Sequence, residues 1–132
     1  MIVLYTLVSL TLVSIFFAMD QAYADTLKSN RSHCYAYLTE LVRSSNFPFT
    51  YVKSNKANLL IDDDQGETVS AQVVFDTNGS GTMGWVQYEI RTHQLLNTSV
   101  DLEAPEPLTF ERVYAEQYER CIKKNESASI SD

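Results

Sequence analysis

Two cysteines and two histidines are the side chains in this 132-residue sequence with the widest chemical range. His33 directly precedes Cys34, and a thiol beside an imidazole could serve as a nucleophile. A disulfide between Cys34 and Cys121 is the stronger interpretation, because the chain begins with an export signal and disulfides persist in exported proteins. Free or intermolecular thiols are the alternative. We therefore expect one disulfide and no catalytic role for His33.

The spacing of histidines and carboxylates does not predict a metal site. His93 lies in a predicted turn, and the sequence has no H-x-x-E or C-x-x-C spacing. The acidic run Asp62, Asp63 and Asp64 could bind Ca²⁺. Counted from Asp62, however, the glycine of a calcium loop would stand at the wrong position, and the twelfth residue, Val73, has no side-chain oxygen. We expect no metal and no cofactor.

Sequence motifs for enzymatic catalysis are also missing. No serine stands in a G-x-S-x-G elbow, and no glycine-rich loop for phosphates or dinucleotides occurs. Nothing distinguishes any two carboxylates as a glycosidase pair. The sequence therefore predicts that the protein is not an enzyme and has no catalytic residues.

Two predicted hairpin loops carry polar side chains that could contact a partner. The first is acidic and contains Asp62, Asp63 and Asp64, which would form a knob suited to a basic protein. The second is rich in glycine and contains Asn78 and Ser80. A solvated hairpin tip is the simpler reading of the acidic run.

Trp85 is the third candidate contact residue. It follows the glycine-rich loop, and strand alternation points it away from the face that carries Val86 and Tyr88. An exposed tryptophan beside a loop is typical of an anchor in a protein interface. The alternative is that a helix covers this face and that Trp85 belongs to the core.

Helical periodicity marks the two ends of the domain that must position these residues. Apolar side chains recur at steps of three and four residues from Cys34 to Val42 and from Phe110 to Ile122, the second run including Val113. Thr109 is the expected N-cap of the second helix. Both cysteines fall on the apolar stripe of their helix, so the disulfide should join helix to helix.

Alternating patterns between the helices predict strands. The expected strands are Phe49–Val52, Ala57–Asp62, Thr68–Phe75, Gly84–Thr92 and Leu95–Leu102. An Asn-Gly pair at 78–79 is a strong hairpin signal, and the acidic stretch around Pro105 and Pro107 is expected to be a polar link. The sequence predicts an α+β domain, with an antiparallel meander of four to five strands flanked by an N-terminal and a C-terminal helix.

The first 24 residues have the features of a cleavable signal peptide. An apolar run from Ile2 to Ala18 is followed by Ala22-Tyr23-Ala24, whose small residues suit a signal peptidase. No basic residue precedes the run, so an uncleaved membrane anchor is the alternative. We expect cleavage to leave a single globular domain over residues 25–132, with a disordered tail over 125–132, located in the periplasm or secreted.

The charge balance narrows the range of partners. The chain has 17 acidic and 10 basic residues, which gives a formal net charge of −7. Nucleic-acid binders normally present a basic face, and an anionic membrane would repel this chain. We therefore exclude nucleic acid and, after signal cleavage, a membrane as partners. A basic protein is compatible with this surface.

The combination of a leader ending at Ala24, an acidic domain, and Cys34 and Cys121 in helices around a meander resembles a known kind of protein. It resembles the small periplasmic immunity proteins that protect bacteria from cell-wall-degrading type VI secretion effectors, and in outline it is similar to periplasmic lysozyme inhibitors. The resemblance is one of overall organisation and carries over no functional residue. It implies an exported, non-enzymatic inhibitor that binds and neutralises a toxic hydrolase.

A periplasmic or secreted protein that binds a small ligand is the alternative hypothesis. The many aromatic residues could line a pocket between the sheet and a helix, and an apolar or glycan ligand would fill it. An exported hydrolase is a third and weaker hypothesis. The sequence leaves open whether two copies of the chain form a homodimer.

Overall fold

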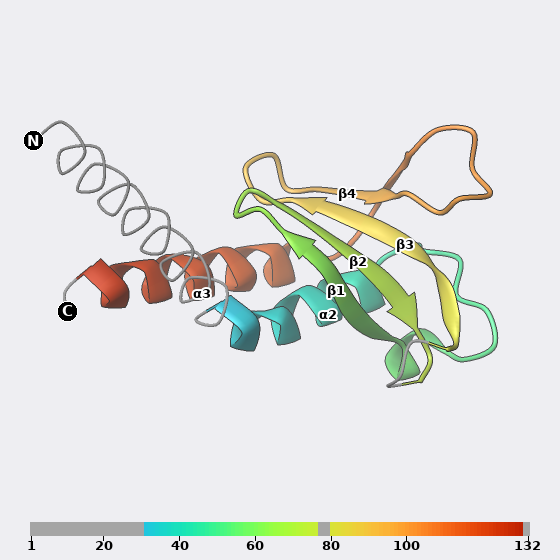
Figure 1. Ribbon diagram of the computed structural model, residues 1–132, viewed down its shortest axis with the longest axis horizontal. Coiled ribbons are helices and arrows are strands. Elements are labelled where there is room, and N and C mark those ends of the chain that lie inside the picture. The colour runs from blue at the N-terminus through green and yellow to red at the C-terminus, as the bar shows by residue number, and fades with distance from the viewer. Residues whose placement is uncertain (1–30, 77–79, 131–132) are drawn as a thin grey trace, which may run out of the picture. The chain divides into compact units, whose positions relative to one another are not determined.

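Five antiparallel strands and two helices make up the domain in the computed structural model, which describes residues 31–76 and 80–130 (Figure 1). A disulfide between Cys34 and Cys121 joins the helices. The predicted α+β class, the meander and the helix-to-helix disulfide are all confirmed. The predicted signal peptide, residues 1–24, lies outside the described residues.

Helix α2 (Tyr35–Arg43) follows a short 3-10 turn, η1 (Ser32–Cys34). Within the predicted apolar run from Cys34 to Val42, Leu38, Leu41 and Val42 are buried, whereas Tyr37 is 38% exposed. The helix ends near the expected position, because the hydroxyls of Ser44 and Ser45 donate to the carbonyls of Leu41 and Val42 at 2.7 and 2.6 Å. These bonds satisfy backbone acceptors that a helix C-terminus leaves open.

The segment Phe49–Val52 is not a strand, so the first predicted strand is wrong. Phe47 and Phe49 pack their rings against each other at a centroid distance of 5.2 Å, and Phe49 contacts the core. Tyr51 then adopts a φ angle of 73°, which no strand can accommodate. A second 3-10 turn, η2 (Ser54–Lys56), leads into the sheet.

The sheet runs in chain order as an up-and-down meander. Its strands are β1 (Asn58–Asp64), β2 (Thr68–Val74), β3 (Thr82–Glu89), β4 (Gln94–Asn97) and β5 (Glu106–Leu108). The last predicted strand ends at Asn97 instead of Leu102. The expected polar link contains the edge strand β5, where Pro107 is tolerated because an edge strand need not donate on its outer side.

Helix α3 (Arg112–Ile130) begins later than predicted, and Thr109 is not its N-cap. The N–H groups ahead of the helix bind side chains that follow α2. Thr109 donates to Asn46 Oδ1 at 2.8 Å, and Glu111 donates to Ser44 Oγ at 3.0 Å. These bonds keep the chain extended up to Arg112.

The buried side of α3 is carried by Ala115, Tyr118 and Ile122. Val113, which the predicted stripe included, is 45% exposed. Ala115 is small, so it allows this face of the helix to approach the core closely. The helix also continues to Ile130, where the sequence predicted a disordered tail from residue 125.

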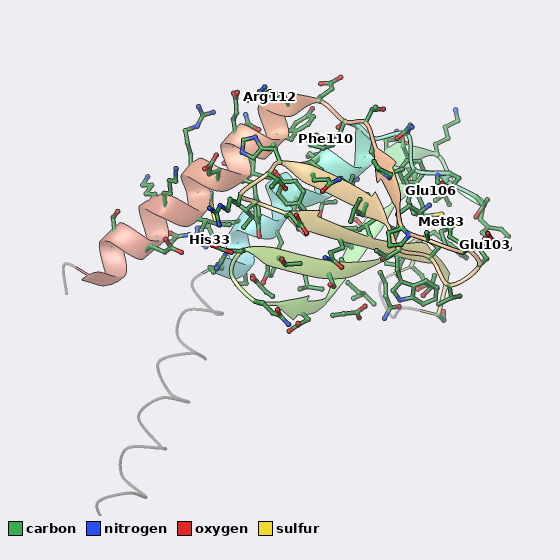
Figure 2. The ribbon with its side chains drawn as sticks, turned by 90° about the horizontal axis from the view of Figure 1, so that it is seen from above. His33, Met83, Glu103, Glu106, Phe110 and Arg112 are labelled. Carbon is green, nitrogen blue, oxygen red and sulfur yellow. A yellow bond between two sulfur atoms is a disulfide. The ribbon has the colours of Figure 1, made fainter. Side chains whose placement is uncertain are left out.

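Both helices lie on one side of the sheet (Figures 1 and 2). The strand residues that face them form the core with α2 and α3, and these include Val69, Ala71, Val73, Val86, Tyr88 and Leu95. Most of the alternate residues of β2 and β3 are only partly buried, although Val74 at the end of β2 is 1% exposed. Within the described chain, no helix covers that second face, which we call the open face.

Candidate functional site

The open face centres on Trp85. Val86 and Tyr88 are 3% and 1% exposed, whereas Trp85 is partly exposed and lies outside the core cluster. The predicted orientation of Trp85 is therefore confirmed, and no helix among residues 31–76 and 80–130 covers it, as the alternative required. On the neighbouring strand β2, the residue paired with Trp85 is Gln72. On its other side, the backbone N–H of Thr98 donates a hydrogen bond to the Trp85 carbonyl at 2.9 Å.

A chain of side-chain hydrogen bonds crosses the open face beside Trp85. Gln72 Nε2 donates to Asp62 Oδ1 at 2.9 Å, and Thr82 Oγ1 donates to Gln72 Oε1 at 3.0 Å. These three residues come from β1, β2 and β3, so the chain fixes polar groups across three strands. Asp62 remains exposed. The arrangement is a tryptophan held beside an oriented amide and an accessible carboxylate.

The three aspartates of the acidic run have different roles. All lie within β1, ahead of the turn at Gly66, and a bulge between Ile61 and Asp63 shifts their register. Asp63 is exposed and accepts a hydrogen bond from Gln65 at 2.8 Å. Asp64 instead accepts from the Tyr35 hydroxyl at 2.7 Å and from the Gly66 N–H at 2.9 Å. Asp64 therefore ties α2 to the β1–β2 hairpin, and only Asp62 and Asp63 are accessible.

The two predicted contact loops do not come together. In a meander, successive hairpin turns lie at opposite ends of the sheet. The two loops lie at the two ends of β2, whose seven residues separate them by roughly 20 Å. Ser80 is exposed at the far end and donates to Asp76 Oδ2 at 2.5 Å. Asn78 lies outside the described residues. Trp85 and Asp62 therefore share a face, while Ser80 belongs to another end of the domain.

An exposed aromatic pair beside Ser80 was not predicted. Tyr51 is 83% exposed and Phe75 is 37% exposed, with their ring centroids 5.3 Å apart. A Cβ on Gly81 would lie 2.6 Å from the Phe75 ring, so a larger residue at this position would have to displace the ring. The left-handed backbone of Tyr51 could not be predicted from residue type, because tyrosine rarely adopts this conformation.

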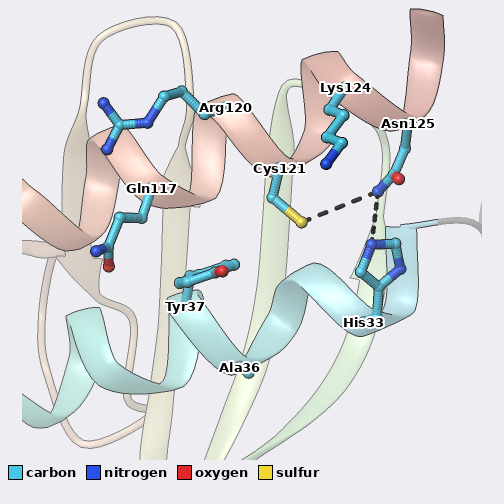
Figure 3. Close-up of a pocket in the computed structure, with 8 residues that line it drawn as sticks. All are labelled: His33, Ala36, Tyr37, Gln117, Arg120, Cys121, Lys124 and Asn125. Atoms are coloured by element: carbon cyan, nitrogen blue, oxygen red, sulfur yellow. Dashed lines mark hydrogen bonds between the residues drawn. The ribbon is translucent and has the colours of Figure 1, made fainter. Parts of the chain in front are cut away.

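A groove between α2 and α3 was also missed. Its volume is about 810 Å³, and it is lined from α3 by Gln117, Arg120, Cys121 and Lys124 and from α2 by Tyr37 (Figure 3). Cys121 of the disulfide forms part of its wall, and the groove opens on the side of α2 and α3 that faces away from the sheet. The alternative hypothesis placed a ligand between sheet and helices, where buried side chains pack together instead.

His93 has a structural role in the turn between β3 and β4. Its φ angle is 51°, and its Nε2 lies 3.0 Å from Glu119 Oε2 on α3. Lys123 Nζ lies 3.1 Å from the other oxygen of Glu119. Hydrogen bonds from Lys123 and then from His93 lower the pKa of Glu119. The cluster therefore links the turn to α3.

His33, Cys34 and Cys121 place three potential metal ligands within 4.8 Å of one another. Both sulfur atoms are committed to the disulfide, so the oxidised protein cannot use them as thiolates. The arrangement therefore offers no thiolate metal site while the disulfide is intact.

The chain was compared with protein-family models, curated proteins and solved structures. None of them matches. The disulfide is consistent with an exported protein, since such bonds persist in oxidising compartments. No helix between residues 31 and 130, leaving aside 77–79, has the length and apolar character needed to cross a bilayer.

Proposed function

We propose that this protein is an exported, non-enzymatic inhibitor that binds a toxic cell-wall hydrolase through the open face and neutralises it. The observation that carries the proposal is Trp85, which is partly exposed on the open face, in the central strand β3, and pairs with Gln72 on β2. Large aromatic side chains surrounded by polar groups contribute most of the binding energy of protein interfaces. The ordered partners of Gln72 reduce the entropy that binding would cost.

The charge of the chain supports a basic partner. Asp62 and Asp63 are exposed at the border of the open face, and the net charge is −7. An enzyme that acts on an anionic cell wall gains from a basic surface, and opposite charges accelerate and orient association. We therefore propose that the protein acts in the periplasm, as an immunity protein that protects its own cell.

The test uses any secreted cell-wall hydrolase that proves to be encoded beside the gene for this chain, and the lack of such a gene counts against the proposal. Both proteins are purified, the dissociation constant is measured by calorimetry, and peptidoglycan hydrolysis is followed with increasing inhibitor. Trp85→Ala should weaken binding by roughly 30-fold or more, as expected for the loss of a central aromatic anchor. Tyr37→Ala is the matched control, because Tyr37 is a 38% exposed aromatic residue on α2, away from the open face.

Two results would overturn the proposal. One is a hydrolase that stays fully active at saturating concentrations of this protein. The other is binding that Tyr37→Ala weakens as much as Trp85→Ala does, which would place the interface on the helices.

A further inference from the structure

We infer that the Cys34–Cys121 disulfide is a thiol-exchange site for small anionic thiols, which attack Cys121 and release Cys34 as the thiolate. This inference concerns the groove between α2 and α3 and goes beyond the proposed function, which rests on the opposite side of the domain. Four features of the groove carry it.

The two sulfur atoms differ in accessibility. Cys121 is partly exposed and lines the groove, whereas Cys34 is 0% exposed and does not line it (Figure 3). Exchange requires a thiolate to reach one sulfur of the bond directly. The groove, at about 810 Å³, is large enough for a thiol of low molecular mass. An incoming thiolate can therefore reach Cys121 and not Cys34.

The leaving sulfur has a hydrogen-bond donor. Asn125 Nδ2 lies 3.1 Å from Cys34 Sγ and 3.9 Å from Cys121 Sγ. The same amide nitrogen lies 3.0 Å from His33 Nε2, which accepts its other hydrogen and holds it in place (Figure 3). A donor at 3.1 Å stabilises negative charge on Cys34, and a stabilised thiolate leaves faster.

The groove is positively charged in an acidic protein. Arg120 and Lys124 are both exposed, line the groove from α3, and make no ion pair within the described chain. They lie one helical turn apart, on the same side of α3 as Cys121. A thiol with a carboxylate or sulfonate group would be attracted here, although the net charge of −7 repels anions elsewhere.

The reaction balances without any further reagent. The thiolate RS⁻ forms an S–S bond to Cys121 Sγ, the bond between the two cysteines breaks, and its electron pair leaves on Cys34 Sγ. A second thiolate attacks the mixed disulfide and releases RSSR and the Cys121 thiolate. Two thiols are oxidised, the protein disulfide is reduced, and α2 is no longer covalently joined to α3.

The experiment compares three thiols of different charge on the folded, oxidised chain. The probes are 2-mercaptoethanesulfonate (anionic), 2-mercaptoethanol (neutral) and cysteamine (cationic), and rate constants are expressed per thiolate at low ionic strength. We expect the anionic thiol to react about tenfold faster than the neutral one, and the cationic thiol to be slowest. After quenching with iodoacetamide, peptide mass spectrometry should place the adduct on Cys121 and the carbamidomethyl group on Cys34.

Variants separate the contributions of charge and of the donor. Arg120→Glu with Lys124→Glu should abolish the preference for the anionic thiol, whereas Lys53→Glu with Lys56→Glu, which makes the same change of charge outside the groove, should retain it. Asn125→Ala should slow all three thiols by about tenfold. The inference is overturned by equal rates for the three thiols, by adducts on Cys34, or by reaction only in denaturant, and the wild-type series alone can give each of these results.

Discussion

On the face of the sheet that packs against α2 and α3, which we call the covered face, Val73 and Leu95 are fully buried. On the open face, their chain neighbours Gln72 and Leu96 stay partly exposed. The same strands therefore present two surfaces of different composition, because alternate side chains point to opposite sides. The covered face contributes most of the apolar burial. The open face can change its side chains with little loss of stability, and it is the side on which a binding surface could evolve.

The largest expected effect comes from removing the bond that holds the covering helices together. Cys34→Ala with Cys121→Ala opens a loop with a sequence separation of 87 residues. We expect the free energy of unfolding to fall by about 4 kcal/mol, since the disulfide restricts the unfolded chain. Urea denaturation followed by circular dichroism measures this. A loss below about 1 kcal/mol would contradict the view that the disulfide stabilises the covered face.

Adjacent leucines on β4 test the two faces directly. Leu95→Ala should cost about 3 kcal/mol, because Leu95 is 0% exposed and its removal leaves a cavity. Leu96→Ala, which makes the same chemical change on the open face, should cost less than about 1 kcal/mol. Equal losses in urea denaturation would show that the open face is also part of the core.

Tyr88 places a polar hydroxyl group within the apolar core of the covered face. Its hydroxyl is buried and finds no hydrogen-bond partner in the described part of the chain. Burial and then the negative charge of Glu119 raise the pKa of Tyr88 to about 12. We expect Tyr88→Phe to stabilise the protein by up to about 1 kcal/mol at neutral pH.

The pH dependence of the Tyr88 contribution has a definite sign. Because the folded-state pKa lies above the ordinary value of 10, the fold disfavours the ionised phenol, so titration of Tyr88 costs no stability below pH 10 and lowers the stability as the pH rises toward 12. The wild type should therefore lose more stability than Tyr88→Phe between these values. Parallel alkaline denaturation curves for the two proteins would contradict this.

The smallest expected effect concerns the link between the β3–β4 turn and α3. The pKa of Glu119 is lowered, so its charge stabilises the fold above its ordinary pKa of 4.5, and this stabilisation disappears as the pH falls below it. Glu119→Gln should cost about 0.5 kcal/mol at pH 7 and nothing in acid. Glu116→Gln, in a more exposed pair with Arg112, is the control with a smaller expected loss. A loss for Glu119→Gln that stays constant with pH would rule out this origin.

The fold class could be predicted from the spacing of apolar residues, because the core residues follow the regular spacing of strands and helices. Val69, Ala71 and Val73 alternate along β2, and Leu38, Leu41 and Val42 recur as in a helix, so local sequence determines the exposed and buried sides. The start of α3 could not be predicted in this way. Hydrogen bonds from Thr109 and Glu111 to the end of α2 connect segments far apart in the sequence.

The candidate sites were harder to predict. Strand alternation was sufficient to orient Trp85. The different roles of Asp62 and Asp64 depend on Gln72 and Tyr35, which no short motif relates to them. The groove requires α2 and α3 to lie together, so its lining residues form no contiguous signal.

The outer strands also determine how the domain can meet other molecules. At one edge, β1 carries a bulge and the exposed charges of Asp62 and Asp63, and at the other, β5 contains Pro107. Bulges, charges and prolines at sheet edges oppose the addition of a further strand from another chain. Both edges therefore disfavour edge-to-edge polymerisation, and the faces of the sheet and the helices are the surfaces left for contacts through side chains.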